Sequence, residues 1–114
     1  MKAKNLALIL AAGMGLASCN VWSGKIGNEE VFQYKGLSEN FLKVTKQDGR
    51  IIEYRDKQGD NKIDSVEITK GRYSTTYTND EVGKEALQIA QKQYEDYLAK
   101  ILEAKKKKAL EDIQ

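Results

Sequence analysis

The segment from Asp56 to Glu67 is the densest group of oxygen-bearing side chains in the chain. Asp56, Asp60 and Asp64 stand at positions 1, 5 and 9 of a twelve-residue stretch, with Gln58 at position 3 and Glu67 at position 12. Calcium is bound by six to eight oxygen atoms, and alternate residues of a tightly curled loop can point inward together. This spacing makes Asp56, Asp60 and Asp64 candidate ligands of a calcium ion.

The acidic segment resembles the calcium loops of EF-hand and dockerin proteins, with Ile63 at the usual aliphatic position 8. It departs from them because Asn61 replaces the Gly of the sharp turn and because strands, not helices, are predicted on both sides. If a strand begins near Asp64, Glu67 cannot return to the ion, since a strand rises about 3.3 Å per residue. The alternative is a plain polar hairpin loop with turn geometry from Gly59 and Asn61. The resemblance implies at most a weak calcium site.

The only cysteine, Cys19, follows a segment with the layout of a secretory signal peptide. Lys2 and Lys4 precede an apolar stretch from Leu6 to Leu16, shorter than the roughly 20 residues that cross a bilayer. Leu16-Ala17-Ser18-Cys19 has an aliphatic residue, two small residues and a cysteine in the order of a lipobox. The chain therefore resembles bacterial lipoprotein precursors. The alternative is an ordinary signal peptide that happens to precede a cysteine.

The resemblance implies that residues 1–18 are removed and that Cys19 carries diacylglycerol through a thioether, usually with a further acyl chain such as palmitate on the freed amine. Two or three acyl chains hold a protein stably on a membrane, whereas one does not. In this class an Asp after the cysteine favours the inner membrane of many Gram-negative bacteria, and here the residue is Asn20. We therefore expect the outer membrane facing the periplasm, or the plasma membrane of a Gram-positive cell.

The composition argues against catalysis and against nucleic-acid binding. The chain has no His, and its single Cys is assigned to lipid, so the commonest base and the thiol nucleophile are missing. No Gly-rich phosphate loop is present. The net charge of +2 belongs to Lys2 and Lys4, so the chain from Cys19 on has 17 basic and 17 acidic residues. We expect a protein that is not an enzyme and has no nucleic-acid partner.

The hydrophobic pattern predicts a tether over residues 19–28, an α+β domain over 29–104 and a charged helical extension over 105–114. Asp48-Gly49 is typical of a type I′ hairpin turn. Short connections favour an antiparallel meander of four or five strands packed against one long C-terminal helix. Trp22, in the tether, could lie at the membrane interface or pack on the domain. The predicted strands are Val31–Lys35, Phe41–Gln47, Arg50–Arg55, Lys62–Lys70 and Tyr73–Thr78.

From Asn79 the apolar residues recur at helical spacing, which predicts a helix over 81–104 that is capped by Asn79 or Asp80. Its apolar stripe ends at about Ala104. Lys105–Lys108 continue the helix, either as a solvated end or as a contact with anionic lipid or cell-wall polymer. The tyrosines of the last strand and the helix are expected in the core: Tyr73, Tyr77, Tyr94 and Tyr97.

The predicted helix is about 36 Å long, whereas a seven-residue strand is about 23 Å long. Unless it crosses diagonally, the helix overhangs the sheet, and Leu98, Ile101 and Leu102 are then candidate residues for binding an envelope protein or a second copy. We expect a small, non-catalytic lipoprotein that binds or organises another envelope component. The alternative is a calcium-stabilised binding module that uses the acidic loop at 56–64.

Overall fold

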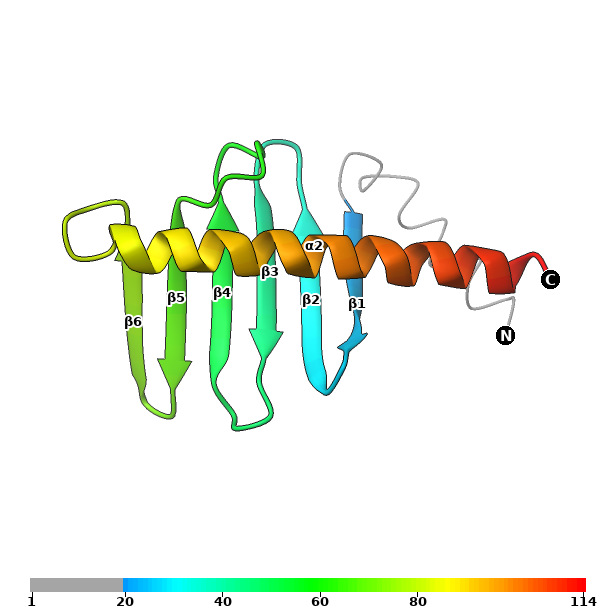
Figure 1. The fold of residues 1–114 in the computed structure, drawn as a ribbon, viewed down its shortest axis with the longest axis horizontal. Coiled ribbons are helices and arrows are strands. Elements are labelled where there is room, and N and C mark those ends of the chain that lie inside the picture. The colour runs from blue at the N-terminus through cyan, green and yellow to red at the C-terminus, as the bar shows by residue number, and fades with distance from the viewer. Residues whose placement is uncertain (1–19) are drawn as a thin grey trace.

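The computed structural model describes residues 20–114, which form one antiparallel sheet covered on one face by a long helix (Figure 1). The strands lie side by side in chain order, so each pairs with its neighbours in sequence. This confirms the predicted α+β meander, with six strands instead of four or five. The elements are β1 Asn20–Ile26, β2 Glu29–Lys35, β3 Asn40–Thr45, β4 Ile51–Asp56, β5 Ser65–Lys70, β6 Tyr73–Thr78 and α2 Lys84–Asp112.

Strand β1 corrects the predicted tether at 19–28. From Asn20 onward this segment is the edge strand of the sheet, paired with β2 at every position from Asn20 to Ile26. The strand pattern was hidden because Gly24 occupies a helix-facing position. A Cβ atom at Gly24 would lie 2.9 Å from the ring of Trp22, so the missing side chain makes room for that ring. Trp22 therefore packs on the domain.

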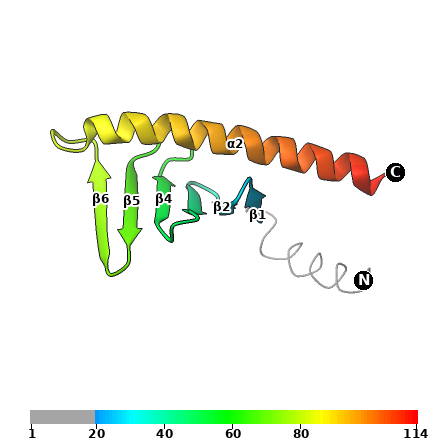
Figure 2. The same ribbon diagram turned by 60° about the horizontal axis from the view of Figure 1, so that its bottom comes forward.

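Helix α2 runs across the strands from β6 at its start to β1, and then continues beyond the sheet (Figures 1 and 2). Six strands about 4.8 Å apart span roughly 24 Å, which about 16 helical residues cover. The buried helix residues extend from Leu87 to Ile101, in agreement with that width. The number of strands therefore sets the covered length of the helix. The C-terminal part of α2 projects beyond β1 (Figure 1), and no helix residue after Ile101 is buried.

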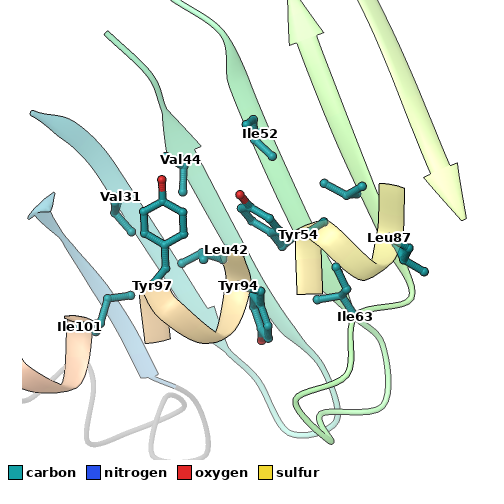
Figure 3. Close-up of a cluster of buried hydrophobic side chains, with 12 residues drawn as sticks. Val31, Leu42, Val44, Ile52, Tyr54, Ile63, Leu87, Tyr94, Tyr97 and Ile101 are labelled. Carbon is teal, nitrogen blue, oxygen red and sulfur yellow. The ribbon is translucent and has the colours of Figure 1, made fainter. Parts of the chain in front are cut away.

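The core lies between the sheet and α2, with Tyr54 of β4 near its centre (Figure 3). The ring of Tyr54 packs against those of Tyr94 and Tyr97, with centroids 6.0 and 6.1 Å apart. The prediction of core positions is confirmed for these two helix tyrosines, and Tyr77 is half-buried against the same cluster. Tyr73 is 80% exposed, so its prediction was wrong. It lies at the end of β6 that extends away from the helix (Figure 2).

The predicted hairpin turn at Asp48-Gly49 and the predicted helix cap at Asp80 both differ in detail from the expectation. The β3–β4 hairpin has Gly49 with φ +93°, but Asp48 is not at positive φ, so the turn is not type I′. The amide of Gly49 donates to the Lys46 carbonyl at 3.0 Å, as in a type I turn followed by a left-handed Gly. Asp80 accepts the Gly83 amide at 2.7 Å and caps a turn before α2, so the helix begins at Lys84 and not at residue 81.

Candidate functional site

Asp56, the first candidate calcium ligand, is fully buried at the end of β4. Its Oδ1 accepts the amide of Gly59 at 2.8 Å, and its Oδ2 accepts the amide of Asn61 at 2.7 Å. The side-chain amide of Asn40 on β3 also donates to Oδ2, at 3.2 Å. Both carboxylate oxygens therefore accept hydrogen bonds from the protein, and Asp56 holds the β4–β5 loop closed from inside.

Asp60 and Asp64 also accept amides of their own loop. The amide of Lys62 donates to Asp60 at 2.9 Å, and the amide of Lys57 donates to Asp64 at 2.6 Å. The first of these bonds is the main reason why the pKa of Asp60 lies below its ordinary value. Glu67 lies on β5, within 4.0 Å of Arg55. Within residues 20–114 there is no group of three acidic, His or Cys side chains placed to hold a metal ion.

The same loop is attached to the helix through Gln91. The Gln91 side chain accepts the Ile63 amide at 2.8 Å and donates to the Asn61 carbonyl at 2.8 Å. Asn61 has φ +69°, so it takes the left-handed conformation that Gly takes in calcium loops. These contacts describe an ordered hairpin loop whose polar groups bond to one another and to α2.

Of the three predicted partner-binding residues, only Leu102 is exposed, at 52%. Ile101 is 2% exposed and belongs to the core, and Leu98 is partly buried against it. The expectation that all three lie on an overhang was wrong because the helix crosses the strands instead of following them. The part of α2 that projects beyond the sheet begins at Leu102, directly after the last buried helix residue, Ile101.

The projecting end of α2, which we define as Leu102–Ile113, has its own apolar stripe. Leu102, Ala109, Leu110 and the C-cap residue Ile113 stand at i, i+7, i+8 and i+11 of one face, and Lys105 and Lys106 occupy the i+3 and i+4 positions between them. All four are exposed, and the lysines Lys105–Lys108 among them are exposed too. This stripe was missed in the sequence because Leu102 was assigned to the predicted core stripe, which was expected to end at about Ala104.

A polar cluster that the sequence did not predict joins the β1–β2 hairpin to α2. Lys46 Nζ lies 2.8 Å from Glu29 Oε2 and 3.4 Å from the Tyr97 hydroxyl, which donates to Glu29 Oε1. Burial raises the pKa of Glu29, but the hydrogen bonds from Lys46 and Tyr97 outweigh burial and lower it. Glu29 is separated from its partners by 17 and 68 residues, so no local signal could have revealed the cluster.

Within residues 20–114, no helix covers the face of the sheet opposite α2 (Figure 2). An open hollow of about 700 Å³ there is lined by residues of β1 to β4, including Phe32, Phe41 and Lys43. The two Phe rings meet edge to face at 6.4 Å, and the Arg55 guanidinium lies 4.8 Å from the Phe41 ring centre. Alternation along these strands could have placed them on one face. The charged residues Lys25, Glu30 and Glu53 also line the hollow.

Cys19, the predicted lipidation site, lies outside the described residues, and the first strand begins at the next residue. No helix within residues 20–114 is long and apolar enough to cross a membrane. Comparisons of the chain with protein-family models, with curated proteins and with solved structures found no match. The function must therefore be argued from the residues themselves.

Proposed function

We propose that this chain is a bacterial lipoprotein that is held on the cell envelope by lipid on Cys19. It acts without catalysis, by binding or organising another envelope component. The observation that carries the proposal is the position of the lipobox: the folded strand β1 begins at Asn20, directly after the cysteine of Leu16-Ala17-Ser18-Cys19. A lipoprotein cleaved before Cys19 would keep the whole described domain. It would also hold that domain against the membrane with no spacer.

The projecting end of α2 is the surface proposed for the interaction. Its apolar residues Leu102, Leu110 and Ile113 are 52%, 59% and 82% exposed. In the described part of the chain every side-chain nitrogen or oxygen that is buried has a hydrogen-bond partner. The interior therefore offers no unpaired polar group that a ligand would be needed to satisfy. This supports a role that is performed at the surface.

The anchor is tested by mass spectrometry of the protein purified from membranes of its native host. The expected mass is that of residues 19–114 plus diacylglycerol, with or without a further acyl chain. Cys19→Ala is expected to keep residues 1–18 and to carry no lipid. An unmodified Cys19 in the native protein would overturn the proposal.

The binding role is tested separately by photocrosslinking in cells. A crosslinking residue at Leu102 or Ile113 is expected to capture one envelope component repeatedly, and the mass of the product shows whether it is membrane lipid, another protein or a second copy of the chain. The same group at Tyr73, which is exposed on the opposite edge of the sheet, serves as the control. The binding role fails if a lipidated protein gives no product from any position on the projecting end.

A further inference from the structure

The projecting end of α2 leaves the domain at the edge where the lipid anchor must be. Asn20 is both the first residue of edge strand β1 and the residue bonded to Cys19 in the chain. Helix α2 passes over β1 and continues beyond it (Figure 1). Lipid attached to Cys19 would therefore bring a membrane to the side of the domain that carries Lys105–Lys108.

The charge of the domain differs between the half that contains β1 and the half that contains β6. The half made of residues 20–46 and 97–114 contains β1 to β3 and the end of α2, and it has nine lysines and six acidic residues. The half made of residues 47–96 contains β4 to β6 and the start of α2, with eight basic and eleven acidic residues. The formally neutral domain thus has an excess of three positive charges beside the anchor and three negative charges away from it.

The projecting end also has the residue pattern of a helix that lies in a membrane interface. Such helices combine lysines with an exposed apolar face that enters the boundary between headgroups and acyl chains. Here Lys105–Lys108 accompany the exposed stripe of Leu102, Leu110 and Ile113. The net charge of the full segment is small because Glu103, Glu111 and Asp112 offset three lysines, so the apolar stripe and the nearby anchor are needed as well.

We infer that the projecting end of α2 lies on an anionic phospholipid bilayer, the same bilayer that holds the lipid on Cys19. This inference rests on the proposed function and names the envelope component that this surface contacts. One anchor fixes only a point of the domain to the membrane, whereas a second contact fixes its orientation. The β1 edge then faces the bilayer, and the exposed edge strand β6 faces away from it.

Hydrogen exchange on the mature lipidated protein tests this inference. The protein is reconstituted into vesicles of phosphatidylcholine alone or of phosphatidylcholine with an equal amount of phosphatidylglycerol. Amides of 102–112 are expected to exchange several-fold more slowly on the anionic vesicles, and this protection is expected to disappear at high salt because ions screen the attraction. Equal exchange on the two vesicles would overturn the inference. Protection by inorganic phosphate on neutral vesicles would also overturn it, because the bilayer would then not be the partner.

Charge variants separate a membrane contact from a general charge effect. Replacing Lys105–Lys108 with Gln is expected to reduce the ratio of bound to free helix by about five-fold for each lysine lost. Protection that survives this change would contradict the inference. The intact mass is measured on the same sample, so a missing lipid, which defeats the proposed function, is distinguished from a lipidated protein with an unprotected helix. The matched control, expected to keep wild-type protection, is Lys57→Gln, Lys62→Gln, Lys70→Gln and Lys84→Gln in the acidic half.

Discussion

At the scale of single residues, Asp56 is the side chain on which the β4–β5 loop most depends. Asp56→Ala would leave the amides of Gly59 and Asn61 without the carboxylate that accepts their hydrogen bonds. We expect a loss of about 3 kcal/mol in the free energy of unfolding, since each buried donor left unpaired costs about 1 to 3 kcal/mol. Urea unfolding followed by circular dichroism measures this loss.

Asp60→Ala is the matched control because the carboxylate of Asp60 is on the surface of the same loop. We expect its unfolding midpoint to stay close to that of the wild type. A larger loss for Asp60 than for Asp56 would contradict the assignment of Asp56 as the main support of the loop. A melting curve with and without calcium tests ion binding separately, because a ligand that binds only the folded state raises its stability.

Glu29 makes the stability of the domain dependent on pH. Its pKa is lowered from 4.5, since the Lys46 and Tyr97 contacts outweigh the effect of burial. A carboxyl group with a lowered folded-state pKa stabilises the protein above its unfolded pKa, and this contribution is lost as the pH falls through the folded value. The stability difference between wild type and Glu29→Gln should therefore shrink from about pH 5 to pH 3.

Urea unfolding at a series of pH values measures this difference. Tyr97→Phe removes one of the two hydrogen bonds to Glu29 and should give an intermediate pH dependence. A stability difference that stays constant over this range would contradict the assignment of the lowered pKa to this cluster.

At the scale of elements, the direction of α2 decides which of its residues matter for folding. Ile101 is 2% exposed and Leu102, its neighbour, is 52% exposed. Ile101→Ala should destabilise the domain by about 2 to 4 kcal/mol through the cavity it leaves. Leu102→Ala should change stability by less than about 1 kcal/mol. Equal losses in the two variants, measured by urea unfolding, would mean that the helix lies differently on the sheet.

The sequence predicted most elements because their patterns are local. Alternation of Leu42 with Val44, and of Ile52 with Tyr54, marks strands whose buried faces are continuous. Strand β1 was missed because Gly24 leaves a gap in that alternation. The direction of α2 relative to the strands was missed because it depends on the number of strands that the helix must cover. The sequence of the helix does not contain this number.

The candidate site was less predictable than the fold because its contacts join distant residues. The acidic loop lies between β4 and β5, but the strand predicted from Lys62 begins only at Ser65. The loop carboxylates accept backbone amides of the same loop, and this choice depends on the turn at Asn61. The cluster of Glu29, Lys46 and Tyr97 links two loops to the helix and leaves no pattern along the chain. The apolar stripe on the projecting end of α2 could have been predicted from residue spacing, but its exposure follows only from the width of the sheet.

At the scale of the whole molecule, one helix crosses the sheet and ties its strands together. The core cluster contains residues of β2, β3, β4, β5 and α2, and Trp22 and Ile26 of β1 pack against it. Loss of any strand would therefore expose the apolar face of the helix to water. We expect the domain to unfold in a single cooperative step.

Two intrinsic probes, one in the sheet and one in the helix, test this cooperativity. Trp22 is the only tryptophan and reports on edge strand β1, whereas far-ultraviolet circular dichroism is dominated by the 29 residues of α2. Coincident transitions in urea are the signature of two-state unfolding. Ile26→Ala, in β1, should move both transitions to lower urea by the same amount. Earlier loss of the Trp22 signal would mean that β1 separates from the sheet before α2 unfolds.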